Sequence, residues 1–363
     1  MAGDTSCATC HRPQLGTGDG LPLSLGTGGI GEGLRRTQGS SPPTLRNAPP
    51  LYNKTHPELQ ALFWDGRVNF SSKPKKLKTP NPNLNGEKPV FDDIVSQLDN
   101  ASAAQSLFPL INEIEMRGHN FSNLTDREVW DEVFNRVIKI EDYKILLEKA
   151  FPSEKWNIGH VGKALAHFQD VEFSTRDTGW DKYLKGDLSA LSLPEKKGAL
   201  TFTRKGRCFM CHNGKHLTNF RFENIIVPHL SLNENFMDKG RGSIDKRKGA
   251  AFQFMVSPLR NVGLTAPYFH NGSMATIEEV IEHYNEPLES YNNYNVDKIN
   301  ELFEANYHMP FISQYTEEAE NLLFRNASRS LHQFLALTEE EKENLALFLK
   351  ISLTEKRFVH LLQ

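Results

Sequence analysis

The sequence is short of cysteine, of long apolar runs and of excess charge of either sign. Its 363 residues include only four cysteines, and 42 basic side chains stand against 45 acidic ones. No stretch approaches the roughly 18 consecutive apolar residues of a membrane-spanning helix. A net charge of −3 also lacks the basic footprint of a nucleic-acid-binding surface. We therefore expect no membrane span and no nucleic-acid partner, and the length favours two domains because one core rarely exceeds about 250–300 residues.

The few cysteines all fall in two copies of one motif, C-x-x-C-H. The copies are Cys7, Cys10 and His11, and Cys208, Cys211 and His212. This is the attachment pattern of c-type haem, in which both thiols bond to the haem and the histidine ligates the iron. A redox-active C-x-x-C needs no histidine at the next position, and two pairs so far apart are poor zinc partners. The sequence therefore predicts two covalently bound haem c groups.

Covalent haem attachment also indicates a compartment. It takes place in oxidising surroundings outside the cytoplasm, so a secretory signal should precede Cys7. Only Met-Ala-Gly-Asp-Thr-Ser stands before it. We expect a periplasmic or otherwise extracytoplasmic protein whose signal has been removed or truncated.

Helical patterns and irregular loops dominate the chain, and strand signals are weak. We predict an all-α fold of two cytochrome c-like haem domains with long irregular loops, residues 1–178 and 179–363. A glycine-rich loop over 12–53 should wrap the first haem, and 57–63 should form a short helix. Residues 69–92 look like an insertion, whose lysine-rich part is either a solvated loop or a docking patch for an acidic partner. Helices are expected from Pro194 and from a capping box at Thr338.

Further motifs point to a family. They are Leu-Phe-Trp-Asp-Gly-Arg at 62–67, Pro-Leu-Arg-Asn at 258–261 and Leu-Thr-Ala-Pro-Tyr-Phe-His-Asn-Gly-Ser at 264–273. With the two haem motifs they make the chain resemble the bacterial dihaem cytochrome c peroxidase superfamily, and within it the MauG-like branch. The resemblance implies an oxidoreductase that uses hydrogen peroxide.

At the first haem the resemblance implies three residues around an open iron position. Glu115 would move a proton between the peroxide oxygens, Gln105 would hydrogen-bond beside it, and Pro109 would keep that side open. By composition alone Glu113 is as plausible as Glu115. Peroxidases of this superfamily carry a histidine that caps the iron, but residues 28–47 contain none, and His56 is expected at the surface. The first haem should therefore need no reductive activation.

At the second haem, Tyr284 stands where classical peroxidases place a methionine ligand. A tyrosinate stabilises high oxidation states of iron, whereas a thioether raises the potential. Residues 277–284 read as a short helix entered at Thr276, with Tyr284 on its apolar face. The alternative is that Tyr284 only packs and Met274 or Met309 ligates the iron.

Two further roles follow from the resemblance. Trp64 would relay charge between the haems, although a buried tryptophan commonly only packs. Asn47, Thr265 and Pro267 match a calcium site made of oxygen ligands, which suit Ca²⁺.

The function implied is oxidation at a distance. Hydrogen peroxide would bring the haem pair to a high-valent, bis-Fe(IV)-like state that oxidises a tryptophan or tyrosine of a partner protein. MauG has a surface tryptophan two residues before its second haem motif, but this chain has Gly206, so the substrate stays open. The alternatives are a peroxidase fed by a small cytochrome c or cupredoxin, and a non-enzymatic dihaem electron carrier.

Overall fold

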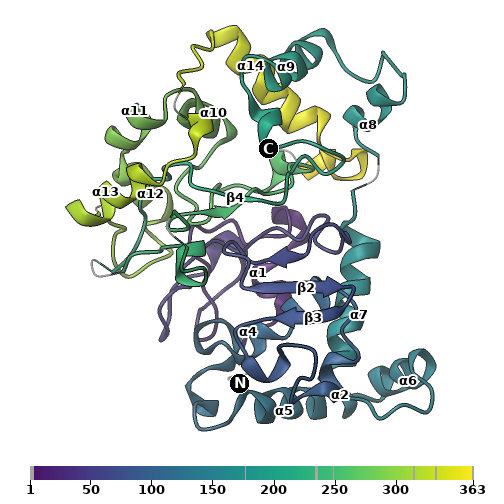
Figure 1. Cartoon of the computed structure of the whole chain (residues 1–363). Coiled ribbons are helices and arrows are strands. Elements are labelled where there is room, and N and C mark those ends of the chain that lie inside the picture. The colour runs from purple at the N-terminus through teal and green to yellow at the C-terminus, as the bar shows by residue number, and fades with distance from the viewer. Residues whose placement is uncertain are drawn as a thin grey trace.

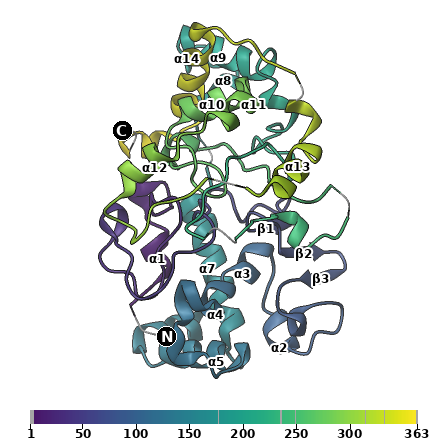
Figure 2. The same cartoon turned by 90° about the vertical axis from the view of Figure 1, so that its left-hand side faces the viewer.

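The computed structural model describes residues 4–361 except residues 176, 234–235, 248, 314 and 332. The described chain is mostly helical with long irregular stretches, which confirms the predicted fold class. Helices α2–α7 gather at one end of the molecule and α8–α14 at the other (Figure 1). The N-terminal segment, purple in Figure 2, runs along one side between them.

The helices divide between these two ends. α1 (Cys7–Cys10) lies between the two groups. At one end are α2 (Asp92–Val95), α3 (Ala101–Gln105), α4 (Phe108–Ile111), α5 (Asp126–Ile138), α6 (Glu141–Ala150) and α7 (Ile158–Phe173). At the other are α8 (Gly179–Leu184), α9 (Leu193–Thr203), α10 (Ile277–Asn285), α11 (Pro287–Asn292), α12 (Val296–Phe303), α13 (Glu317–Arg325) and α14 (Glu339–Leu347). The capping box predicted at Thr338 is present, because its hydroxyl accepts from Glu341 N and its own N–H donates to the Glu341 carboxylate.

The short strands correct one prediction. β1 (Ala61–Leu62), β2 (Val68–Ser72) and β3 (Lys75–Lys78) form an antiparallel sheet in that order, and β4 (Phe222–Glu223) pairs with β5 (Phe254–Met255). The helix predicted over 57–63 is wrong, since these residues form turns that lead into β1. Gly66, at φ +68°, closes a turn by donating to Phe63 O at 3.1 Å, which lets Leu62 pair with Val68. The backbone hydrogen bonds between β1 and β2 take the place of the helical hydrogen bonds that were expected there.

The expected surface insertion at 69–92 is only partly right. Its lysines are exposed, as predicted. However, Phe70, Leu77 and Leu84 are buried in the same core as α3 and the fully buried Trp130. The segment is therefore a hairpin that packs on the helices, and β2 contacts α3 directly.

The loop predicted over 12–53 is irregular, but it also packs against the other end of the chain. Leu21, Leu23 and Leu25 share a core with Ile299 of α12 and its neighbours. The Tyr307 hydroxyl donates to Leu23 O at 2.6 Å. The segment that follows the first haem motif is therefore held by the half that carries the second.

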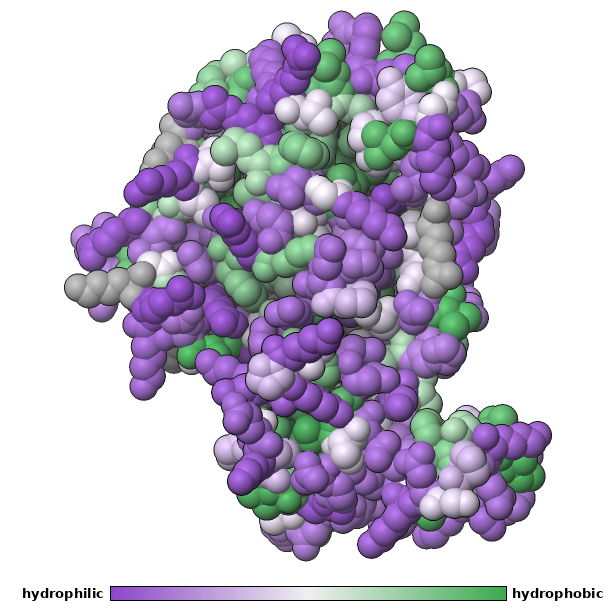
Figure 3. Space-filling view, turned by 45° about the vertical axis from the view of Figure 1, so that its right-hand side comes forward, coloured by the Kyte–Doolittle hydropathy of each residue, from purple (hydrophilic) through white to green (hydrophobic). Residues whose placement is uncertain are grey.

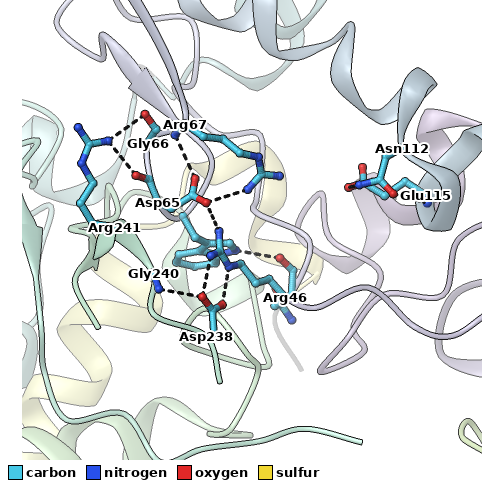
Figure 4. A network of polar contacts seen from close by, with 11 residues as sticks. Arg46, Asp65, Gly66, Arg67, Asn112, Glu115, Asp238, Gly240 and Arg241 are labelled. Atoms are coloured by element: carbon cyan, nitrogen blue, oxygen red, sulfur yellow. Dashed lines mark hydrogen bonds and ion pairs between the residues drawn. The ribbon is translucent and has the colours of Figure 1, made fainter. Parts of the chain in front are cut away.

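A buried ion-pair network joins the halves a second time (Figure 4). Arg46 donates to both carboxylate oxygens of Asp238, at 2.6 and 2.7 Å, and to Asp65 at 2.6 Å. Arg241 donates to the carbonyls of Asp65 and Gly66, which follow Trp64 directly. Burial raises the pKa of Asp238, but the hydrogen bonds and charge of Arg46 outweigh this and keep that pKa below its ordinary value. The network fixes the loop that carries Trp64.

The face in Figure 3 is mostly hydrophilic, with small separate hydrophobic patches. Among the described helices, none is long and apolar enough to cross a membrane.

Replacing Arg46 by methionine should destabilise the protein by about 3–5 kcal/mol, because the Asp238 carboxylate then lies buried without a cation. The free energy of unfolding from chemical denaturation checks this. Arg247→Met is the matched control: Arg247 is 81% exposed where it pairs with Asp245, so its loss should change little.

The effect should also depend on pH. In the wild type the pKa of Asp238 lies below its ordinary 3.8, so the stabilisation is complete above that value and is lost as the pH falls through the folded-state pKa. In Arg46→Met the hydrogen bond from Gly240 N remains, but burial, the largest influence on Asp238, is no longer opposed by the guanidinium, so the pKa of Asp238 rises and acid neutralises the buried charge. The difference in free energy of unfolding between the wild type and Arg46→Met should therefore decrease as the pH is lowered from about 7 to about 3. A difference that stays constant would contradict this account of the network.

Candidate functional site

The second C-x-x-C-H motif forms a tight turn between α9 and the loop beyond. Gly206 N donates to Thr201 O at 2.8 Å, and Arg207 takes a left-handed conformation at φ +55°. His212 N then donates to Cys208 O at 2.8 Å, which brings the imidazole back over the turn. Cys208, Cys211 and His212 all line one cavity of about 210 Å³.

The remaining walls of that cavity are largely apolar and come from both strands and helices. They include Phe202 of α9, Val256, Leu259, Ile277, Val280 and Ile281 of α10, Leu337, and Leu345 and Leu349 at α14 and just beyond. Two thiols and one imidazole in an apolar cavity are the donor set of a c-type haem. The residues present therefore fit the predicted cofactor.

Both motif histidines are held in the tautomer that iron requires. His212 Nδ1 lies 3.1 Å from Leu217 O, and His11 Nδ1 lies 2.9 Å from Thr17 O. A ring N–H donated to a carbonyl leaves Nε2 as the nitrogen that can ligate a metal. Burial lowers the pKa of His212 to about 4 and also lowers the pKa of His11, so both rings are neutral at neutral pH.

Tyr284 lines the same cavity as His212. It lies on α10, which begins after the N-cap Thr276 as predicted, and it shares its inward face with Val280 and Ile281. Burial raises the pKa of Tyr284, and the nearby Cys208 and Cys211 raise it further. The phenol therefore stays protonated unless a cation such as iron compensates the phenolate charge.

The two methionines considered as alternative ligands, Met274 and Met309, do not line this cavity. Met274 is 5% exposed and packs in the core of α10 and α14 without lining the cavity, and Met309 is 57% exposed. His283 uses both ring nitrogens, one with Ser290 Oγ and one with Ile225 O. Met255 does line the cavity, but its N–H donates to Trp64 O at 2.8 Å, at the end near that tryptophan. Tyr284 as the iron ligand remains a prediction that this placement favours.

The first C-x-x-C-H motif occupies α1 and is enclosed by the loop after it. His11 N donates to Cys7 O at 2.9 Å, as its counterpart does in the second motif. Buried Arg36 donates to the carbonyls of Leu25, Gly26 and Gly31, and so shapes the loop around α1.

Glu115 lies at this first motif. It is part of a short π-helical segment, η4 (Glu113–Arg117), and its charge acts on Cys10. The Asn112 Nδ2 donates to Glu115 Oε1 at 2.9 Å, and burial raises the pKa of Glu115 despite the nearby Arg67 (Figure 4). Glu113, two residues away, is exposed. The structure thus brings Glu115 rather than Glu113 to the motif.

Trp64 lies between the two regions. It lines the large cavity and also a small one that it shares with Gln105 at the end of α3. The Trp64 Nε1 donates to Asn47 O at 2.8 Å. Pro109 lies in α4 directly before η4 and is not among the residues that line either cavity.

The three residues matched to calcium also meet at the large cavity. Asn47, Thr265 and Pro267 all line it. Asn47 Nδ2 donates to Leu21 O at 2.8 Å, which leaves its Oδ1 as a free acceptor among the described contacts. Groups of three or more His, Cys, Asp or Glu side chains that could hold a metal are absent from the described residues. An oxygen site of amide and carbonyl groups fits what is present.

Sequence reasoning missed three residues that shape these sites. Asn112 had a local signal, because an asparagine at a helical N-cap three residues before a glutamate is a capping pattern. Arg46 and Lys54 had none, since their surroundings come from distant parts of the chain.

Comparison with known proteins identifies the family. The sequence profile described as "Di-haem cytochrome c peroxidase" matches residues 1–189, and the chain belongs to that family. It is 31% identical to the cytochrome c551 peroxidase of Pseudomonas aeruginosa over 76% of this chain and 64% of that protein. It is 29% identical to the methylamine utilization protein MauG of Methylorubrum extorquens over 78% of this chain and 64% of that protein.

The chain thus spans less than two thirds of the length of these curated relatives. A solved structure of a MauG-like protein associated with microbial copper homeostasis has the same fold, with a TM-score of 0.64, 24% identity, and coverage of 98% of this chain and 85% of that one. Membership of the di-haem family implies two haem groups, in agreement with the two motifs.

Tyr284→Phe should change the ligation of the second haem while both haems stay attached, because the thiols and His212 are untouched. The absorption and electron paramagnetic resonance spectra of the ferric protein should change from those of a six-coordinate iron to those of an iron that has lost one ligand. Tyr268→Phe is the control, since Tyr268 lines the same cavity but its hydroxyl already donates to Val262 O at 3.1 Å. A methionine–iron charge-transfer band in the wild type would contradict the assignment.

Proposed function

We propose that this protein is a peroxide-dependent dihaem oxidoreductase, with haem c attached through Cys7 and Cys10 and through Cys208 and Cys211. The observation that carries the proposal is Glu115, a carboxyl beside the first motif whose pKa is raised by burial. Peroxide cleavage needs a group that takes a proton from one oxygen and gives it to the other, and burial raises the pKa of this carboxyl so that it holds a proton more readily than an exposed glutamate.

In the proposed reaction, the side chains of this protein move the protons during peroxide reduction. Hydrogen peroxide takes up two electrons and two protons to give two waters, and the haem groups supply the electrons and store the oxidising equivalents. Glu115 takes the proton from one peroxide oxygen and returns it to the other. Asn112 holds Glu115 Oε1 through its amide, which leaves Oε2 free to exchange the proton.

Transfer between the sites would use Trp64 and Tyr284. Trp64 borders the cavity of the second motif and the small cavity with Gln105, so its indole provides a route between the halves. An anionic tyrosine ligand stabilises oxidised iron at the second site. Oxidising equivalents formed at the first site would therefore be partly stored at the second site.

For the substrate, we propose a tryptophan or tyrosine side chain of a partner protein, oxidised at a distance. The exit cannot be at Gly206, where a Cβ would lie 2.9 Å from Thr201 O and leave no room for a tryptophan. Electron transfer from the partner protein must therefore use another part of the surface.

One observation favours the second candidate, a peroxidase that receives electrons from a small cytochrome c or cupredoxin. Phe209 and Met210, inside the second motif, are 48% and 59% exposed and offer an apolar contact beside the cofactor. A calcium ion held by Asn47, Thr265 and Pro267, and an extracytoplasmic location, complete the proposal.

Adding hydrogen peroxide to the fully ferric protein should change the haem spectra without prior reduction. The reason is that the loop at 28–47 has no histidine to close the first iron. Stopped-flow absorption measures the rate. Reaction only after half-reduction would point to the peroxidase, and no reaction in either state to an electron carrier.

Glu115→Gln gives the sharper comparison within the same experiment. It keeps the shape and the contact with Asn112 but cannot exchange a proton, so the peroxide reaction should slow by about 10²–10⁴-fold. Glu113→Gln makes the same change on an exposed residue and should react at the wild-type rate. Equal rates for all three proteins would overturn the role of Glu115.

A further inference from the structure

Lys54 is a buried lysine that the proposed function leaves unused. It is 5% exposed, and it lies in the segment between Asn47 and β1. Its side chain lines both the large cavity of the second motif and the small cavity shared by Trp64 and Gln105. It therefore stands where the two halves of the protein meet.

The Lys54 ammonium has no partner within the described part of the chain. No hydrogen bond or ion pair of its Nζ is found there, and burial lowers the pKa of Lys54 to about 8. The other buried cation of the cavity, Arg260, is already held by both carboxylate oxygens of Asp181, at 2.6 and 2.8 Å. A buried cation without a counter-ion is unfavourable, so the site calls for an anion.

The cavity also indicates where on its occupant that anion lies. In haem c the thiols bond to one edge of the porphyrin, and the two propionate carboxylates leave the opposite edge. Cys208 and Cys211 act electrostatically on Tyr284 but are not among the groups that act on Lys54. Lys54 also lines the small cavity with Trp64, which neither thiol lines.

We propose that the Lys54 ammonium forms an ion pair with a propionate of the haem attached at the second motif, and so fixes that haem edge beside Trp64. The inference rests on the haem assignment of the proposed function, but not on the reaction with peroxide. The pair cancels the charge next to the indole, which a bare ammonium would make harder to oxidise. Lys54 is thus a positioning residue that also raises the reduction potential of the second haem.

The test compares haem-loaded Lys54→Met, Lys54→Arg and Lys215→Met with the wild type. Lys215 is an exposed lysine three residues after His212, so its loss removes the same charge near the same haem. Haem content is counted first, and the midpoint potential of the second haem is then measured by spectroelectrochemistry. In Lys54→Met the ferric-to-ferrous ratio at the wild-type midpoint should rise about tenfold, a downward shift of about 59 mV. Lys54→Arg should restore most of it, and Lys215→Met should match the wild type.

An unchanged potential in fully loaded Lys54→Met would overturn the proposal, as would a Lys54→Arg protein that behaves like Lys54→Met. If Lys54→Met does not load haem, a crystal structure of the loaded wild type decides: Nζ lies within about 4 Å of a propionate oxygen, or the proposal is wrong. Because none of these readouts uses peroxide, a wild type that ignores peroxide but shows the shift refutes only the proposed function. A wild type without haem at the second motif refutes both.

Discussion

The placement of Arg46 between two buried carboxylates is the constraint on which the arrangement of the two sites depends. Asp65 belongs to the loop that carries Trp64, and Asp238 belongs to the opposite half of the chain. Asp238 has no other ion-pair partner among the described residues, whereas Asp65 also pairs with Arg67 at 3.1 Å, so the burial of Asp238 depends on the Arg46 guanidinium. The bond from Trp64 Nε1 to Asn47 O then fixes the indole, and the bond from Met255 N to Trp64 O fixes its backbone. A residue so held suits the proposed transfer between the two sites, because the fold sets its position relative to both motifs.

The first site depends on the same interlocking. The loop after the first motif is tied to the second half through Tyr307, and it also touches the proposed proton-transfer group. Thr27 N donates to Glu115 O at 3.0 Å, and a Cβ on Gly26 would lie 2.1 Å from Ile114 O. The loop therefore closes tightly over the backbone of η4. Glu115 is half-buried in this arrangement, and its partial removal from water is what raises its pKa.

What could be predicted from the sequence was local. Three features depend on residues within about one turn of each other: the spacing inside each C-x-x-C-H motif, the cap at Thr276 and the inward face of α10. The structure confirms the cap and the helix that follows it. The sequence predicts a surface insertion at 69–92 because the lysines there stand out, whereas Phe70 and Leu77 are buried only through packing on α3. The pairing of Arg46 with Asp238 joins positions 192 residues apart, which no local pattern reveals. The burial of Lys54 could not be predicted either, because the cavity that it lines is built by residues from both halves of the chain.

The most direct test of the central claim, that Trp64 links two sites into one oxidising unit, is stopped-flow absorption after one equivalent of peroxide is mixed with wild type and Trp64→Phe. Trp180→Phe serves as the control, since Trp180 lines neither cavity. In the wild type and the control, the spectra of both haems should change together. In Trp64→Phe, the first haem should react at its usual rate while the second lags far behind. Simultaneous changes at both haems in Trp64→Phe would contradict the account.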